Sequence, residues 1–364
     1  MKKIILIIFL LLAGTMQAQL LDVFSKPKIV NTTWYSLDLD GSTEYASKTS
    51  PLGLDLNSAN YLSGDNTAFT TTVGDWVDNG DVSSSIASSS LQMVASGATS
   101  SDYISLAQTY LSSSWVDGLN YTIQLSAKSA ASSGFTVYVG THLVATFTTT
   151  TSAVIKAITF TYDNSWGTEI RIYPLVADTY TFDNVDVSEA YDLSIEGWFK
   201  TNNKSLRQGL FDFSDGKYYL GLRSGVLRFT VWDSPSSFNI YGDAPVDSVW
   251  TQFKLKHNRA SGFVSTGYTN YTDSTSLAGY KPPSISKFSI GVESVTNYFN
   301  GQIGKITITR TNGLGEVTGT SIYDWSGDAS TFLKDKGTLG NDLTGTNITT
   351  DDVNSWTSNY TEAK

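Results

Sequence analysis

The chain of 364 residues contains no cysteine, which excludes disulfide bonds, thiolate metal sites, a cysteine nucleophile and a lipid-modified cysteine after a signal sequence. Histidine is nearly absent as well. His142 and His257 lie in unrelated segments, and no Ser-His-Asp or metal-ligand spacing accompanies either of them. Each is interpreted as a surface or hydrogen-bonded histidine. Because the chain has no disulfide bonds, its stability must come from packing alone.

Clusters of positive charge are also lacking, and the formal net charge is -10 at pH 7. Phosphate binding requires clustered lysine and arginine, so nucleic acid is not an expected partner.

Only the N-terminus carries a long apolar run: Met1 to Lys3 are followed by apolar residues 4–13 and by small residues up to Ala18, which is typical of a secretory signal. We expect an exported protein, secreted or at the cell surface, that starts near Gln19 and does not insert into the membrane after signal removal. An uncleaved anchor is the alternative.

Aromatic residues and short alternating segments are abundant. Aromatics make up 13% of the chain, beside many serines and threonines, which suits exported β-sandwiches with polar outer faces. From Tyr191 to Arg310 short strands alternate with turn residues, and no helical period is present. In the segment 192–200, Leu193, Ile195 and Phe199 fall on one side of an extended strand. The pattern predicts an antiparallel meander.

Three separated segments resemble the laminin G-like, concanavalin A-type jelly roll. They are the Leu-Asp-Leu-Asp-Gly-Ser element within 35–45, the strand 193–200 and the strand 299–308. In that family the first two follow each other closely, whereas here more than a hundred residues separate them. The resemblance therefore implies an insertion.

The interval 59–187 has its own strand pattern, and a structureless loop of this length is uncommon in a compact domain. Gly74-Asp-Trp76, the alternating segment 118–128 and the closing segment 180–187 resemble the carbohydrate-binding jelly roll of families 4 and 9. We expect two antiparallel jelly-roll β-sandwiches, one nested within the other. The expected boundaries are a signal at 1–18, an outer sandwich at 19–58 plus 188–312, an inserted sandwich at 59–187 and a C-terminal segment at 313–364.

The C-terminal segment has two interpretations. Residues 335–345 resemble the turn and short strand that precede the first matched element in many laminin G-like proteins, so the segment either completes the outer sandwich or is an unrelated tail. The outer sandwich also needs its opening strand, and we expect Leu37 and Leu39 to pair into the sheets of the meander.

Glycan binding is the function that this fold and composition favour. A sugar presents apolar faces ringed by hydroxyls, so a site needs exposed aromatic rings with amide or carboxylate groups beside them. Trp76 is expected in the core, and core packing is the alternative for every other aromatic. The candidate site residues are Trp115, Tyr110, Tyr103, Trp166, Trp198, Gln108 and Asn120.

Both resemblances imply calcium as a structural cofactor, since a hard cation takes carboxylate and carbonyl oxygens. The implied ligands are Asp183, with Asp65 and Asn66 nearby, and Asp40 in the outer sandwich. An Asx turn or an edge-strand charge is the alternative for Asp183.

A catalytic role is not expected. Sandwich glucanases carry a Glu-x-Asp-x-x-Glu strand, and no such spacing exists here. Glu196 is alone on its strand, and Asp212 and Asp215 are expected to flank a turn. The sequence thus predicts an exported, non-catalytic glycan-binding or adhesion protein whose partner is a polysaccharide or cell-surface glycan. The alternatives are a structural or decorating protein of a cell surface, fibre or virion, acting through protein contacts or self-association, and a glycan hydrolase.

Overall fold

The computed structural model describes residues 28–49, 51, 53–55, 57–213, 218–233, 236–242, 244–259, 263–267, 273–276, 285, 287–293, 296–326 and 331–362. Regular structure in these residues consists of β-strands and four short 3-10 helices, so the predicted all-β class is confirmed. The expected signal at 1–18 lies outside the described residues. Within the described part of the chain, no helix is long and apolar enough to cross a membrane.

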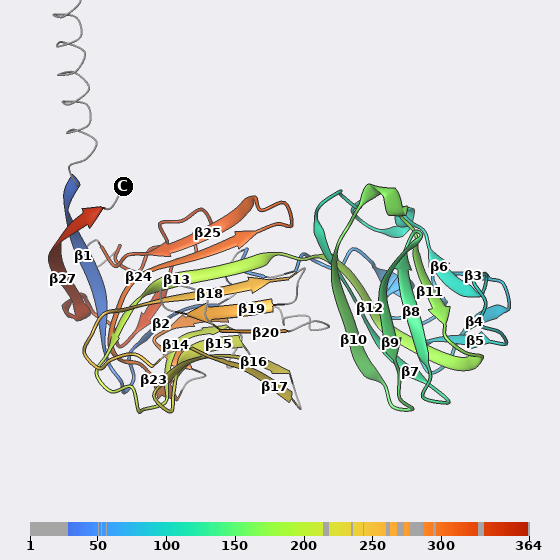
Figure 1. Cartoon of the computed structure of the whole chain (residues 1–364), viewed down its shortest axis with the longest axis horizontal. Coiled ribbons are helices and arrows are strands. Elements are labelled where there is room, and N and C mark those ends of the chain that lie inside the picture. The colour runs from blue at the N-terminus through green and yellow to red at the C-terminus, as the bar shows by residue number, and fades with distance from the viewer. Residues whose placement is uncertain are drawn as a thin grey trace, which may run out of the picture.

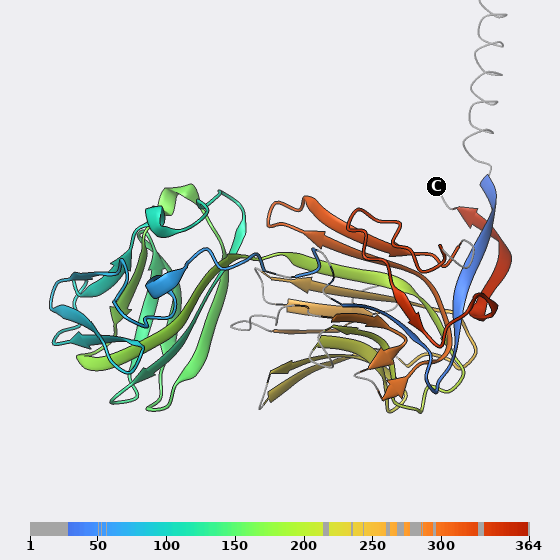
Figure 2. The ribbon, with the colours of Figure 1, turned by 180° about the vertical axis from the view of Figure 1, so that it is seen from behind.

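The strands form two lobes that lie side by side (Figures 1 and 2). One lobe contains β3 to β12, and the other contains β1, β2 and β13 to β27. We refer to them as the inserted sandwich and the outer sandwich.

Two five-stranded antiparallel sheets build the inserted sandwich. Their facing side chains make one apolar core that includes Phe69, Trp76, Phe135 and Phe182, and this confirms that Trp76 is a core residue. The first sheet has the order β10 (Val154–Thr161), β7 (Asn120–Ser129), β12 (Asp178–Glu189), β5 (Leu91–Ala95) and β4 (Val82–Ile86). The second has the order β3 (Val77–Asn79), β6 (Tyr103–Leu106), β11 (Ile170–Pro174), β8 (Gly134–Val139) and β9 (His142–Thr148).

The outer sandwich has an eight-stranded and a seven-stranded sheet. The first runs β20 (Asp273–Ser276), β19 (Phe263–Gly267), β18 (Thr251–Asn258), β13 (Asp192–Thr201), β24 (Asn300–Thr311), β1 (Lys28–Asp40) and β27 (Val353–Glu362), with β25 (Val317–Tyr323) paired to β24. The second runs β17 (Ser236–Tyr241), β16 (Val226–Asp233), β15 (Tyr218–Arg223), β14 (Gln208–Phe213), β21 (Lys287–Ile290), β2 (Tyr45–Thr49) and β26 (Thr344–Thr346). The short strands β22 (Val292–Glu293) and β23 (Asn297–Tyr298) pair with each other.

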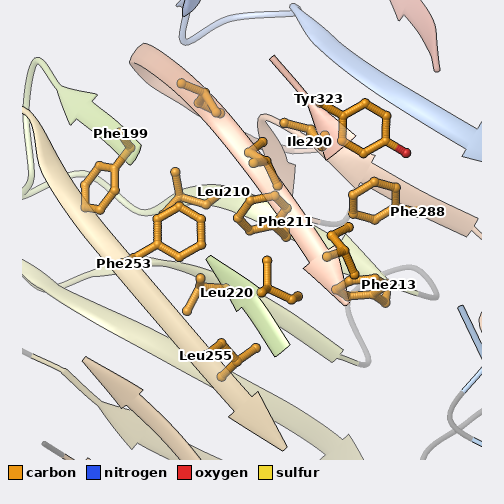
Figure 3. Close-up of a cluster of buried hydrophobic side chains, with 14 of the residues drawn as sticks. Phe199, Leu210, Phe211, Phe213, Leu220, Phe253, Leu255, Phe288, Ile290 and Tyr323 are labelled. Carbon is orange, nitrogen blue, oxygen red and sulfur yellow. The ribbon is translucent and has the colours of Figure 1, made fainter. Parts of the chain in front are cut away.

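An aromatic core fills the space between these two sheets (Figure 3). Phe211 packs against Phe253 at 5.3 Å and Phe213 against Phe288 at 5.0 Å between ring centroids. Leu193, Ile195 and Phe199 point into this core, as their alternation predicts. Leu37 pairs with Ile303 and Leu39 with Gly301, which confirms the expected pairing of the opening strand with the meander.

The C-terminal residues add strands to both outer sheets. β26 pairs with β2, and β27 pairs with β1 along ten positions, from Lys28 opposite Glu362 to Leu37 opposite Val353. Trp325 is fully buried, and its indole Nε1 donates to the carbonyl of Gly304 at 2.8 Å. The segment is therefore part of the outer sandwich.

The chain enters and leaves the inserted sandwich through two segments that lie side by side. Asn57 and Ala190 form an isolated antiparallel bridge, and the amide of Ser58 donates to the carbonyl of Glu189 at 2.8 Å. The turn between β24 and β25 also reaches the inserted sandwich, because a Cβ at Gly313 would lie 2.6 Å from the amide nitrogen of Asn120. The lobes thus meet over several segments.

Arg259 fills the centre of this junction and is 2% exposed. Its Nη2 donates to Thr122 Oγ1 at 3.1 Å, to Asn57 Oδ1 at 3.2 Å and to Thr159 Oγ1 at 3.4 Å. Its backbone amide donates to Asp192 Oδ1 at 2.7 Å. Burial of a guanidinium is costly without hydrogen bonds, and the bonds from Nη2 to Thr122 and Thr159 link the outer sandwich to the inserted one.

Candidate functional site

Three tyrosines form a row across the outward face of the second sheet of the inserted sandwich. Tyr103, Tyr173 and Tyr138 come from the adjacent strands β6, β11 and β8, and we call them the tyrosine row. Their neighbours in sequence, Ile104 and Ile172 among them, are buried in the core, so strand alternation turns the tyrosines outward. Each tyrosine is half-buried.

The rings are in contact but not coplanar. The ring centroids of Tyr103 and Tyr173 are 4.7 Å apart with planes at 38°, and those of Tyr138 and Tyr173 are 4.9 Å apart at 62°. Tyr173 therefore lies at the centre of the row, and successive rings present differently inclined surfaces. Such a surface fits a ligand whose successive units are rotated relative to one another better than it fits a flat ligand.

A charged pair lies beside the rings on the same sheet face. The guanidinium of Arg171 is 5.1 Å from the ring centroid of Tyr103, and Arg171 Nε donates to Glu169 Oε2 at 2.6 Å. Burial opposes the charge on Arg171, but hydrogen bonds to Glu169 and Tyr173 outweigh this effect and raise its pKa. The guanidinium stays charged, with fixed donors close to the aromatic rings.

The amide side chain of Asn79 lies at the β3 end of the row. Asn79 on β3 is opposite Tyr103, and its Nδ2 donates to Ser105 Oγ and to the carbonyl of Val77, each at 3.2 Å. These bonds orient the side-chain oxygen of Asn79 as an acceptor at the sheet edge. The face thus combines apolar ring surfaces with an anchored donor and an anchored acceptor, which are the groups that bind the faces and hydroxyls of a sugar.

Of the residues predicted from the sequence, Tyr103 belongs to this row. Tyr138 and Tyr173 were missed, although alternation alone places Tyr138 on the face opposite Phe135, Val137 and Val139. What the sequence does not reveal is that β6, β11 and β8 are neighbours.

Trp115 and Asn120 are structural residues, which corrects the prediction that they are exposed in a glycan site. Trp115 is 6% exposed; it packs against Tyr121 at 4.7 Å, and its Nε1 donates to the carbonyl of Thr168. Asn120 is 3% exposed, and its Oδ1 accepts a bond from Thr161 Oγ1 at 2.8 Å. Trp115 is on a loop, but its indole is directed back under that loop and completes the core.

Gln108, Tyr110 and Trp166 are more accessible. Gln108 and Tyr110 lie in a 3-10 helix, η2 (Gln108–Tyr110), and Tyr110 is 46% exposed. Trp166 lies in η3 (Asn164–Trp166), and one face of its ring is covered by His142, whose imidazole stacks on it at 3.8 Å. None of the three is in ring contact with the tyrosine row among the described residues.

Trp198 lies on the outer sandwich, on β13, with its side chain directed outward and 37% exposed. Its exposure shows that it is neither part of the core nor covered by the inserted sandwich. His257 is buried, and its Nδ1 shares a hydrogen bond of 2.9 Å with the hydroxyl of Tyr218, so it is a satisfied histidine of the core.

The carboxylates expected to hold calcium are separate from one another. Asp183 accepts from the amide and the side chain of Asn184, and Asp40 accepts from the amide and hydroxyl of Ser42. Asp65 accepts from the amides and hydroxyls of Thr70, Thr71 and Thr72, whose hydrogens point at the oxygens a cation would need. Across the described residues no group of three or more acidic or histidine side chains is close enough to hold a metal ion. The arrangement at Asp65 does not fit a cation, and calcium at Asp183 or Asp40 stays a prediction.

Of the acidic residues weighed for catalysis, Glu196 and Asp212 are described, and they lie on strands of different sheets. Glu196 is exposed on β13, opposite Lys254. Asp212, which was expected to flank a turn, is the second-last residue of β14; it is buried and lies opposite Tyr219 and Ser289. Asp215 lies outside the described residues.

No family model and no curated protein matches the sequence. Solved structures similar to it include the CBM22-1-GH10 modules of Clostridium thermocellum xylanase 10B, at 11% identity and a TM-score of 0.30, over 37% of this chain and 29% of that one. The CBM22-1 xylan-binding domain of Paenibacillus barcinonensis Xyn10C is similar at 17% identity and a TM-score of 0.28, over 34% of this chain and 92% of that domain. Mouse laminin alpha1 domains LG4-5 are similar at 12% identity and a TM-score of 0.29, over 66% of this chain and 94% of that one. At these scores the similarities assign neither a ligand nor an activity to the chain.

Proposed function

We propose that the chain is an exported, non-catalytic glycan-binding protein and that the tyrosine row is its binding face. The observation that supports this most directly is the contact of three tyrosines from three neighbouring strands on the outward face of a sheet. Outward strand positions need no aromatic ring for folding, since the core of the inserted sandwich is already filled from the opposite face. Rings gathered there serve a ligand.

The polar groups around the row define the class of that ligand. Arg171 and Asn79 supply donors and an acceptor at fixed positions, and Tyr103, Tyr138 and Tyr173 add three hydroxyls. A ligand with apolar faces and many hydroxyl groups satisfies both kinds of surface, and sugars have this combination. The inclined rings favour a polysaccharide chain over a single sugar, because adjacent sugar units also differ in orientation.

The test is a glycan array with the mature chain, followed by calorimetry on each polysaccharide that binds. We expect Tyr173→Ala to weaken binding roughly tenfold or more, because it removes the central ring, a tenfold loss being about 1.4 kcal/mol. Tyr173→Phe keeps the ring and should retain most of the affinity. Tyr110→Ala is the matched control, as it removes an exposed tyrosine of the same sandwich outside the row.

Two results would contradict the proposal. If no sugar binds at millimolar concentration and light scattering shows self-association, the chain acts through protein contacts. If reducing sugar is released and the release disappears in Glu196→Gln, the chain is a glycan hydrolase.

A further inference from the structure

Two tryptophans form a second aromatic surface on the outer sandwich, whereas the tyrosine row is on the inserted sandwich. Trp198 is on β13, and Trp250 lies just before β18, the strand paired with β13. Gly304 on β24 lies between them: a Cβ at this glycine would be 3.1 Å from Trp198 Cβ and 3.3 Å from Trp250 Cζ3. We call Trp198, Lys200, Trp250 and Gly304 the tryptophan patch.

An irregularity in the sheet creates this arrangement. The pairing of β13 with β24 shifts register between Gly197 and Phe199, opposite residues 303–306. The shift leaves Gly304 facing the tryptophans, and the absence of a side chain there lets both indoles approach the sheet. A larger residue at this position would push the rings apart.

The patch carries positive charge in a chain that is acidic overall. Lys200 Nζ is 5.5 Å from the ring centroid of Trp250, and Lys305 is exposed next to Gly304. Further along the same face Lys254 is opposite Glu196, while Lys256 is opposite the uncharged Ser194. The chain has a formal net charge of -10, so the lysines beside the two indoles are a local exception to its acidity.

Amide side chains complete the surroundings. Gln252 is opposite Trp198, and Gln302 is opposite Lys200. Asp38 and Asp40 are the acidic residues of the next strand, β1, and Gln302 Nε2 donates to Asp38 Oδ2 at 3.4 Å. Rings, amides and ammonium groups therefore occur together on one exposed sheet face.

We propose that the tryptophan patch is a second binding site and that it takes an anionic polysaccharide. The indoles of Trp198 and Trp250 stack on the apolar faces of the sugar rings, the glutamines bond their hydroxyls, and Lys200 with Lys305 binds the acidic substituents. The charge distinguishes this site from the tyrosine row, where Arg171 is already paired with Glu169. The proposal goes beyond glycan binding by the tyrosine row and does not depend on it.

Affinity electrophoresis of the full chain tests this proposal, using native gels that contain polygalacturonate, dextran sulfate or neutral dextran. We expect at least one of the two anionic polymers to slow the protein and dextran not to slow it. The two anionic polymers separate a carboxylate ligand from a sulfate ligand. Added salt should weaken the effect, since the lysines are exposed and open to screening.

Variants locate the site. Trp198→Ala should weaken binding at least roughly tenfold, as expected for a central aromatic contact. Lys200→Gln should weaken it roughly two- to fivefold, the size of an exposed ion pair. Lys128→Gln is the matched control, because this exposed lysine lies on β7 of the inserted sandwich, away from the tryptophan patch, and Tyr173→Ala should also leave polyanion binding unchanged.

The proposal is overturned if neither anionic polymer slows the protein, if dextran slows it equally, or if Trp198→Ala and Lys200→Gln both bind as the wild type does. Loss of polyanion binding in Tyr173→Ala alone would also overturn it, while supporting the tyrosine row as the binding face. Conversely, if Tyr173→Ala leaves neutral glycan binding intact, the tyrosine row is not the binding face, and the proposal for the tryptophan patch is unaffected. An unchanged thermal unfolding transition in Trp198→Ala and Lys200→Gln shows that each variant is folded.

Discussion

The inserted and outer sandwiches differ in how the chain builds them. All strands of the inserted sandwich, β3 to β12, follow one another in a single continuous segment. The outer sandwich is assembled from two segments, with β1 and β2 before the insertion and β13 to β27 after it. The inserted sandwich can therefore fold from local chain, whereas the outer one must bring distant segments together.

Their outward faces differ as well. The tyrosine row of the inserted sandwich lies beside a paired arginine, whereas the tryptophan patch of the outer sandwich contains a lysine. The cores, in contrast, are both apolar and rich in aromatic rings. The two lobes thus share a way of folding and present different chemistry to solvent.

The largest expected effect comes from cutting the chain at the junction. A chain of residues 191–364 should not fold, because it lacks Leu37, Leu39 and Ala46, which are buried in the outer core. A chain of residues 57–190 should fold alone, since both of its sheets are complete. Circular dichroism and thermal unfolding of the two fragments check this. A cooperative transition in the first fragment would show that the outer sandwich does not need its opening strands.

The next effect concerns the buried arginine of the junction. Arg259→Ala leaves Asn57, Thr122 and Thr159 without their shared donor, and we expect the free energy of unfolding to fall by about 1–3 kcal/mol. Calorimetry should then show the two sandwiches unfolding in better separated steps. Arg223→Ala, at the end of β15 and outside these contacts, is the control, and an equal loss in both variants would contradict a special role for Arg259.

A smaller effect depends on pH and differs in sign between Asp65 in the inserted sandwich and Glu189 at the junction. In the inserted sandwich, hydrogen bonds from Thr71, Thr70 and Thr72 lower the pKa of Asp65. The ordinary pKa of an aspartate is about 3.9, so the stability that Asp65 contributes is present above that pH and is lost as the pH falls toward the lower folded value. Asp65→Asn should therefore lower the melting temperature near neutral pH and reduce its fall in acid.

Glu189 at the junction should behave in the opposite sense. Burial raises its pKa, while bonds from Tyr191 and the charge of Arg310 oppose the rise. Its folded pKa lies above the unfolded value of about 4.3, so its contribution decreases as the pH rises through that window. Glu189→Gln should flatten this decrease. Denaturant unfolding over a series of pH values measures both variants, and slopes of the same sign for both would contradict the comparison.

Calcium is expected to have the smallest effect. A cation at Asp183 would stabilise the inserted sandwich and one at Asp40 the outer sandwich. At a calcium concentration equal to the dissociation constant the gain is only about 0.4 kcal/mol. We expect EDTA to lower the melting temperature slightly, and Asp183→Asn and Asp40→Asn to show which lobe responds. An unchanged melting temperature with EDTA would count against both sites.

Much of the strand content could be predicted from the sequence, because apolar alternation is a local property. β7, β8, β10 and β12 follow segments whose apolar residues alternate. β3, β4 and β6 were not predicted, since Val82 to Ile86 consists mainly of serine and β3 has three residues. Short polar strands form because their neighbours pair with them, and that information is not local.

The candidate sites could be predicted only in part, for the same reason. Alternation places Trp198 and Tyr138 outward, but it does not show that Gly304 lies beneath Trp198 or that Tyr173 lies beside Tyr138. For Trp115 the sequence left a binding role and core packing both open, and the structure shows that it is buried. A binding surface depends on which strands are neighbours, and neighbours are decided by pairing across the whole chain.

The bridge between Asn57 and Ala190 has a mechanical consequence. The two connections of the inserted sandwich meet at this bridge, so tension carried along the chain can pass across it without stretching the strands in between. The outer sandwich bears the load instead. Lys28 and Glu362 are opposite each other at the same end of the β1–β27 pair. A force applied to these two ends would therefore break the hydrogen bonds of the pair one after another, beginning at that end. Under force, then, β27 would come away first, while the inserted sandwich and its tyrosine row would keep their shape.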